Sequence, residues 1–178
     1  MNAIALINSY YPDNNQLKSL LLFHSRQVCE RTMLIIQQHP ELTLDRALLY
    51  DGALLHDIGI YLTHAPSIFC YGKADYLLHG HLGAEILLRE GYPALARICE
   101  RHTGTGLTKE AILSRHLDIP AADYLPETLE EKAVCYADKF YSKSKPERIR
   151  NVDEAYHSLL PFGAEGAERF MQWHRIFG

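Results

Sequence analysis

The sequence lacks a long apolar run, an excess of positive charge and any closely spaced pair of cysteines. No basic region precedes the short apolar run at the N-terminus, and no stretch reaches the length of a membrane span. We therefore predict a cytoplasmic protein with no membrane partner. The formal net charge of -4 gives no general attraction to the phosphate backbone of DNA or RNA, so no nucleic-acid partner is expected.

The four cysteines, Cys29, Cys70, Cys99 and Cys135, lie far apart in the sequence. Because they form no CxxC pair, they indicate neither a zinc ribbon nor a disulfide framework, and we expect buried, reduced thiols. Internal repeats, low-complexity tracts and long polar linkers are also missing. These absences favour one compact globular unit over a repeat array or a disulfide-stabilised scaffold.

Helical periodicity recurs along almost the whole chain, which predicts an all-α, single-domain helical bundle over residues 1–178. Apolar residues at three- and four-residue steps predict a long helix over 16–38, which ends before Pro40. A second helix is expected from about Thr43, a candidate N-cap, to the His56-Asp57 doublet, with Gly59 ending it.

Further helices are predicted over about 79–90, 93–102 and 128–141, and two more in the tail, over about 146–160 and 164–177. Thr128 and Glu131 fit a capping box that opens the helix carrying Asp138. Residues 60–78 show no sustained period and contain Pro66 and Gly72, so they are a candidate loop or lid.

Four polar residues stand in apolar helical surroundings: His24, His56, Asp57 and Asp138. A buried imidazole or carboxylate needs a partner, and a shared metal ion would satisfy all four. Taken singly, each is more often a satisfied core residue or a surface residue than a ligand. Their order along the chain, His in one helix, His-Asp at the end of the next and Asp in a later one, favours a common site.

This order, H…HD…D with the form "HDIG" at His56, resembles the HD-domain superfamily of metal-dependent phosphohydrolases. The resemblance covers about Leu20 to Lys145. It implies a metal-binding core over about 17–145, with C-terminal helices over about 146–177 packed against it. "HGHLGAEIL" is similar to a stretch of the family that places a ligand at His79, whereas His81 lies about 200° round the helix. "RHTGTG" supplies His102, where branches with two metals carry another histidine.

The resemblance implies a divalent-metal cofactor, with two ions drawn from Fe, Mn, Co, Ni, Zn or Mg. Asp57 would bridge the ions, and His24, His56 and Asp138 would surround one, while His79 and His102 bind the other. The implied metal ligands are His24, His56, Asp57, His79, His102 and Asp138.

The implied reaction is hydrolysis of a phosphate ester or anhydride in a small phosphorylated partner, expected to be a nucleotide. Asp57 is also a candidate to orient the attacking water. Lys139 and Arg101 are candidate catalytic cations that offset phosphate charge, with Lys109 and Lys73 as weaker candidates. The alternative for each cation is a solvated helix surface. The sequence leaves open whether the chain forms a homo-oligomer.

Two further resemblances differ in what they imply, and the first supplies no substrate. Residues 106–139 are similar to a group of uncharacterised microbial HDIG proteins, and short segments around His102 and Asp138 resemble hydrolases that split dinucleoside tetraphosphates symmetrically. The chain lacks the GYP segment of cyclic-di-GMP phosphodiesterases. A similar ligand set occurs in HD proteins with two irons that oxidise small organic substrates, so a di-iron oxygenase is a second hypothesis. A non-catalytic nucleotide-binding module is a third.

Overall fold

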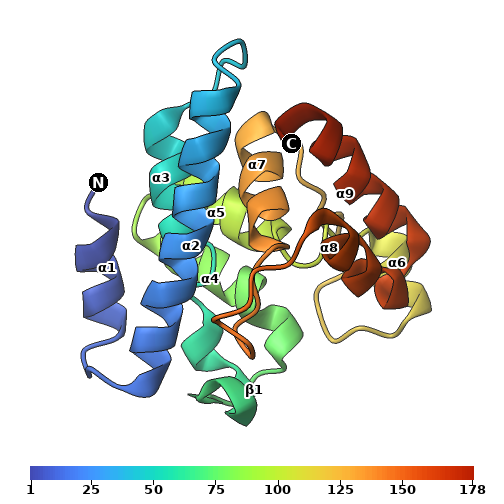
Figure 1. Cartoon of the computed structure of the whole chain (residues 1–178). Helices are drawn as coiled ribbons and strands as arrows, with labels where there is room; N and C mark the ends of the chain where they lie inside the picture. Colours follow the sequence, from blue (N-terminus) through green and yellow to red (C-terminus); the bar gives the residue numbers. More distant parts are fainter.

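The computed structural model describes residues 1–178 and confirms the predicted all-α class (Figure 1). The only strands, β1 (His64–Ala65) and β2 (Cys70–Tyr71), pair as a minimal antiparallel hairpin. The α-helices are α1 (Ala3–Tyr10), α2 (Gln16–Gln38), α3 (Arg46–Leu55), α4 (His79–Arg89), α5 (Pro93–Arg101), α6 (Lys109–Ser114), α7 (Leu129–Asp138), α8 (Val152–Leu159) and α9 (Ala164–Phe177).

Helix-capping residues explain where two of the central helices begin. Asn15 accepts a hydrogen bond from the backbone N–H of Lys18 at the start of α2, and α2 spans the predicted residues 16–38. At α7, Thr128 and Glu131 form the predicted capping box, with both reciprocal hydrogen bonds present. These caps satisfy backbone donors that a helix start otherwise leaves unpaired.

The helices share one apolar core, which runs from Ile7 of α1 to Phe177 of α9. Helices α2, α3, α5 and α7 lie side by side at its centre, and α4 packs against α5 (Figure 1). The C-terminal α9 contacts α7 through the stacked rings of Tyr136 and Phe170. None of the helices combines the length and apolar character needed to cross a lipid bilayer.

The second predicted helix is shorter than expected at both ends. Its N-cap is Asp45 and not Thr43, because the Asp45 carboxylate accepts hydrogen bonds from the N–H groups of Ala47 and Leu48. The helix ends at Leu55, and His56 and Asp57 lie in the turn that follows. The expectation that the doublet lies on the helix and that Gly59 ends it was therefore wrong.

Gly59 instead allows a close backbone approach. A Cβ atom on Gly59 would lie 2.5 Å from the backbone nitrogen of Gly83 and in contact with the carbonyl oxygen of His79. The φ angle of Gly59 is -83°, so its conformation does not require glycine, but its packing does. The turn after α3 thereby rests directly on the first turns of α4.

Residues 60–78 are ordered and partly buried. Three 3-10 turns, η1 (Ile60–Leu62), η2 (Pro66–Ile68) and η3 (Tyr76–Leu78), alternate with the β1–β2 hairpin. The side chains of Ile60, Ile68 and Cys70 are buried in the core. The sequence predicted no regular element here because turns this short carry no periodicity.

Other boundaries also differ from the predictions. Helices α1 and α6 were not predicted. Helix α7 ends at Asp138, which is its last residue rather than an interior one, and α8 begins at Val152, after an Asn151 capping box, rather than near Pro146. All four cysteines are buried and none forms a disulfide.

Candidate metal centre

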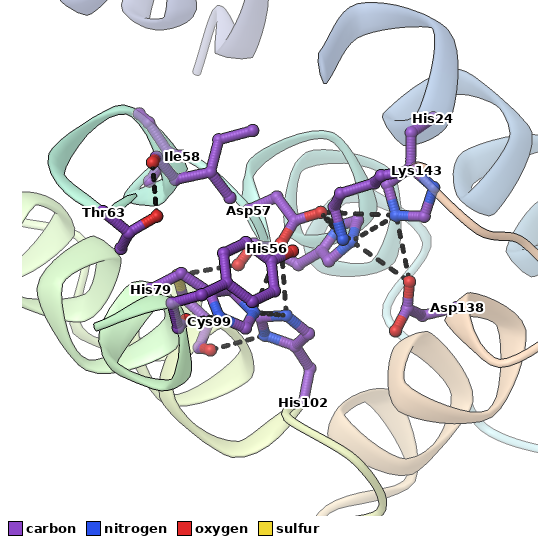
Figure 2. A network of polar contacts seen from close by, with 12 residues as sticks. His24, His56, Asp57, Ile58, Thr63, His79, Cys99, His102, Asp138 and Lys143 are labelled. Carbon is purple, nitrogen blue, oxygen red and sulfur yellow. Dashed lines mark hydrogen bonds and ion pairs between the residues drawn. The ribbon is translucent and has the colours of Figure 1, made fainter. Parts of the chain in front are cut away.

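Five separate segments bring six polar side chains together in the core (Figure 2). Helix α2 contributes His24, the turn after α3 contributes His56 and Asp57, α4 begins with His79, His102 follows α5, and Asp138 ends α7. All six side chains are buried. Most of these residues lie at helix ends, where helices that run in different directions can converge.

One group of donors gathers around the Oδ2 atom of Asp57. Nε2 of His24 lies 3.3 Å from Asp57 Oδ2, and Nε2 of His56 lies 3.1 Å from it. Asp138 closes this group, with its Oδ1 atom 3.0 Å from His24 Nε2 and 3.6 Å from His56 Nε2.

The other carboxylate oxygen of Asp57 faces the second group. Asp57 Oδ1 lies 3.5 Å from Nε2 of His79 and 3.4 Å from Nε2 of His102. The donor atoms of His24, His56 and Asp57, and those of Asp57, His79 and His102, each lie within 4.8 Å of one another. Asp57 is thus common to two donor sets, one at each of its oxygens.

Backbone carbonyls fix the orientation of three rings. Nδ1 of His56 donates to the carbonyl of Ala53 at 2.7 Å. Likewise, Nδ1 of His79 donates to Tyr76 and Nδ1 of His102 to Cys99, each at 2.6 Å. A carbonyl oxygen can only accept, so the proton of each neutral ring is on Nδ1 and Nε2 presents a lone pair to the centre.

The ring nitrogens lie close to one another in pairs. Nε2 of His79 lies 3.0 Å from Nε2 of His102, and Nε2 of His24 lies 3.2 Å from Nε2 of His56. His79 and His102 are both held by Nδ1–H···O=C bonds, so when both rings are neutral they cannot hydrogen-bond to each other through Nε2. Imidazole nitrogens and carboxylate oxygens at this spacing suit divalent transition metals. The chemistry of the donor set therefore fits a divalent metal centre.

Two lysines place positive charge at the carboxylates. The ammonium of Lys143 lies 2.6 Å from Asp57 Oδ2, and that of Lys139 lies 2.7 Å from Asp138 Oδ2 and donates to the carbonyl of His102. Sequence analysis singled out Lys139 but missed Lys143, which lies five residues beyond Asp138 in an irregular segment. A lysine in such a segment has no helical phase that would point it toward the site.

The remaining predicted side chains lie elsewhere. The Arg101 guanidinium donates to the carbonyl of Leu125 at 2.5 Å and pairs with Glu127, and it contacts none of the six clustered side chains. His81 pairs with Glu100, as expected for a residue on another face of α4. The exposed Lys73 makes no ion pair.

The charges at the centre shift several pKa values in opposite directions. Burial acts to raise the pKa of Asp57 and of Asp138. The lysines and histidines around each carboxylate, with Lys143 first at Asp57 and Lys139 first at Asp138, together outweigh burial and hold both pKa values well below the ordinary value. Burial lowers the pKa of His79 to about 3, so this ring is neutral at pH 7. Burial opposes the charged form of His56 as well, but Asp57 and Asp138 raise its pKa to about 9.

A cavity of about 340 Å³ opens beside the centre. Asp138, Lys139 and Lys143 line one side, and residues of the 60–78 segment, including Ile68 and Tyr76, line another. The ring of Tyr76 also stacks on His79, with ring centroids 4.6 Å apart. The segment predicted as a loop or lid is thus a wall of the cavity next to the donor cluster.

Comparison with known proteins gives a family model, the HD domain, that matches residues 21–142. An uncharacterised protein of Methanocaldococcus jannaschii is 37% identical over 146 residues, which are 76% of this chain and 79% of that protein. A protein of Picrophilus torridus named tRNA (cytidine(56)-2'-O)-methyltransferase is 35% identical over 159 residues. The match covers 84% of this chain but only 42% of that relative, so the chain corresponds to about two fifths of its length.

The structural comparison gives the HD domain of the L. monocytogenes phosphodiesterase PgpH. It has a TM-score of 0.53 and 16% sequence identity, and the alignment covers 90% of this chain and 95% of that domain. The same domain in complex with cyclic-di-AMP has a TM-score of 0.51, with 87% of this chain and 88% of that domain covered. At this identity the likeness concerns the fold.

Proposed function

Because the chain belongs to the HD-domain family, we propose that it is a metal-dependent phosphohydrolase that cleaves a phosphate ester or anhydride in a nucleotide. One observation carries the proposal: two buried donor sets share Asp57 beside a cavity lined by Lys139 and Lys143. A metal centre beside a cationic cavity suits the recognition of a phosphoryl group.

The donor sets indicate which residues hold which ion. His24, His56, Asp138 and one oxygen of Asp57 would hold the first ion. His79, His102 and the other oxygen of Asp57 would hold the second. Divalent cations bound there supply Lewis acidity, which polarises a phosphoryl oxygen and lowers the pKa of a water molecule.

Residues of the chain then bind and orient the substrate. Lys139 and Lys143 line the cavity with their ammonium groups within 2.7 Å of carboxylates, so both are held in place as donors for phosphoryl oxygens. We assign the predicted role of offsetting phosphate charge to these two lysines and not to Arg101, whose guanidinium is bound by Leu125 and Glu127. Asp57, as a hydrogen-bond acceptor between the donor sets, would orient the attacking water.

The lysines also favour hydrolysis over the oxygenase hypothesis. A cavity for a neutral organic substrate gains nothing from two desolvated ammonium groups, whereas a phosphate is stabilised by both. Protein that retains iron under air and consumes oxygen with an organic substrate, without releasing phosphate from any phosphorylated compound, would support the oxygenase instead.

The test combines metal analysis with a screen of mononucleotides, cyclic nucleotides and dinucleotides in the presence of Mn, Fe, Co and Mg. We expect hydrolysis of at least one class by the native protein. Asp57→Ala should lose metal and lower the rate by a factor of about 10³ or more, since it removes the ligand common to both sets. Asp13→Ala changes an exposed aspartate and serves as the matched control.

Circular dichroism of Asp57→Ala should retain the helical content of the native protein. This control separates loss of the site from loss of the fold. Full activity in a folded Asp57→Ala protein, or native protein that binds none of the four metals, would refute the proposal.

A further inference from the structure

A second cavity adjoins the one beside the metal centre. This outer cavity has a volume of about 520 Å³ and shares Ser142, Ser144 and Arg150 with the metal-site cavity. No apolar side chain lines it. Lining of this kind suits an anionic, well-hydrated group better than a nucleobase, which is bound on apolar or aromatic surfaces.

Positive charge is concentrated along both cavities. The segment that follows Asp138, which we call the basic loop (residues 139–150), carries five of the 18 lysines and arginines of the chain: Lys139, Lys143, Lys145, Arg148 and Arg150. Its one acidic residue is Glu147. Although the net charge of the chain is -4, these clustered cations produce a local positive potential, which attracts anions toward the metal centre.

The basic loop is held in a fixed path. The N–H of Arg150 donates to the carbonyl of Phe140 at 2.8 Å, and the Arg150 guanidinium donates to the carbonyl of Lys139 at 3.1 Å. The side chain of Gln27 on α2 reaches the carbonyl of Pro146 at 3.3 Å. These bonds join the two ends of the loop to each other and tie its middle to α2, so the path of the loop is preorganised.

The outer cavity has donors that the fold does not use. The exposed Lys145 side chain makes no hydrogen bond or ion pair within the chain. Arg148 pairs through one nitrogen with Glu154, which leaves its other N–H groups free. The Glu154 carboxylate is itself engaged by this pair and by the backbone N–H of Asn151 at 3.0 Å.

We propose that the outer cavity binds a second phosphate group of the substrate while the reacting phosphate lies at Lys139 and Lys143. Lys145 and Arg148 would contact this second phosphate. This inference rests on the proposed phosphohydrolase function and narrows its substrate class to compounds with more than one phosphate. The continuity of the two cavities, the charge of the loop and the absence of apolar lining together support it.

The test is equilibrium binding of AMP, ADP and ATP to the Mn²⁺-loaded full chain, measured by calorimetry at fixed free Mn²⁺. For the native protein we expect affinity to rise at least about tenfold from AMP to ATP, as for one additional charge-assisted contact. Lys145→Gln, which removes no contact of the fold, should reduce this rise, and Lys145→Gln combined with Arg148→Gln should abolish it. AMP affinity should stay within about twofold in both variants.

The matched control is Arg89→Gln combined with Arg175→Gln. These two exposed arginines lie outside both cavities and make no ion pair. The control should keep the native ratio of ATP to AMP affinity. An unchanged ratio in the Lys145 and Arg148 variants, or equal affinities for AMP and ATP in the native protein, would overturn the inference. Because binding is measured, a protein that shows the expected ratio but hydrolyses nothing would refute only the proposed function.

Discussion

Backbone carbonyls three residues upstream hold the rings of His56, His79 and His102 at the centre. The same contact recurs in each case because each histidine lies in or beside a helical turn, where the carbonyl of residue i-3 is within reach of Nδ1. The bond aims Nε2 at the centre and keeps the proton of the neutral ring on Nδ1. This preorganisation lowers the entropic cost of assembling the ligands.

Lys143 has two roles that can be separated by experiment. Without metal, its ammonium is the nearest positive charge to the fully buried Asp57. Lys143→Gln should therefore lower the free energy of unfolding of the metal-free protein by about 3 kcal/mol, as expected when one partner of a buried ion pair is removed. Chemical denaturation in the presence and absence of a chelator measures this change.

The metal-loaded Lys143→Gln protein should regain most of this stability, because bound cations then compensate the Asp57 charge. Its hydrolysis rate should still fall by about tenfold or more, since a donor to the phosphoryl group is lost. Lys73→Gln, which changes an exposed lysine, should alter neither property. If the native and Lys143→Gln proteins have the same free energy of unfolding in the presence of chelator, the ion pair between Lys143 and Asp57 does not stabilise the metal-free protein.

The residues of the site were predictable to different degrees. His24, His56, Asp57 and Asp138 were indicated by polarity in apolar surroundings, and His79 and His102 by family resemblance; the structure brings all six together. Lys143 was not predicted, since neither periodicity nor motif marks it. Arg101 was chosen because it precedes His102, but adjacent residues point in different directions, and its guanidinium binds Leu125 and Glu127.

At the scale of the helices, the contact between the turn after α3 and the start of α4 holds His56 and Asp57 close to His79. Gly59 and Gly83 lie at this contact, and a Cβ on Gly83 would also meet the Sγ atom of Cys99. The Cys99 thiol in turn donates to the carbonyl of His56 at 2.9 Å. Small residues thus let three segments that carry ligands approach one another.

Gly59→Ala should break this contact. The new methyl group would collide with the backbone at His79 and Gly83, which cannot move as a flexible side chain can. We expect a loss of about 2 kcal/mol or more in unfolding free energy. We also expect a weaker second ion site, because His79 must shift, and metal titration of the folded variant measures that loss.

Gly91→Ala is the control for this change. Gly91 has a φ of +83°, and no neighbouring atom lies within 4 Å of the position that a Cβ would take, so an alanine there costs backbone strain but causes no collision. It should lower stability by about 1 kcal/mol and leave metal binding unchanged. If Gly59→Ala binds metal as the control does, the contact does not position His79.

The helices themselves were largely predictable, because apolar stripes place α2, α4, α5, α7 and α9 and the capping box marks the start of α7. The α3 start was misplaced because Thr43 and Asp45 are both good N-caps, and only tertiary packing selects between them. The structure of residues 60–78 could not be predicted for another reason. It depends on burial of Ile60 and Ile68 in the core and not on a local periodicity of the sequence.

For the chain as a whole, charge distribution matters more than net charge. The acidic total excludes general attraction to polyanions, yet the basic loop gives one face the opposite sign next to the centre. Clustering of five cations within residues 139–150 was visible in the sequence, but its position beside the metal ligands was not.

Protonation should be coupled to metal binding. In the metal-free protein the pKa of His56 is raised to about 9, so the ring is protonated near neutral pH, and a metal ligand must be neutral. We expect Mn²⁺ binding to release about one proton from His56 near neutral pH, and less as the pH rises through about 9. Calorimetric titrations in two buffers of different ionisation enthalpy measure this release.

The same shift affects stability without metal. Because the folded-state pKa of His56 exceeds its ordinary value of 6.5, its contribution is full below that pH and is lost as the pH rises through about 9. Metal binding near neutral pH without proton release would contradict the assignment of His56 as a protonated residue that becomes a ligand.

The sharing of Asp57 by two ion sites is tested most directly by counting bound metal in single-ligand variants by mass spectrometry after reconstitution. The native chain should bind two ions, His24→Ala and His102→Ala about one each, and the exposed-residue control His64→Ala two. A native chain that binds one ion or none, or His24→Ala and His102→Ala proteins that both retain two, would contradict it.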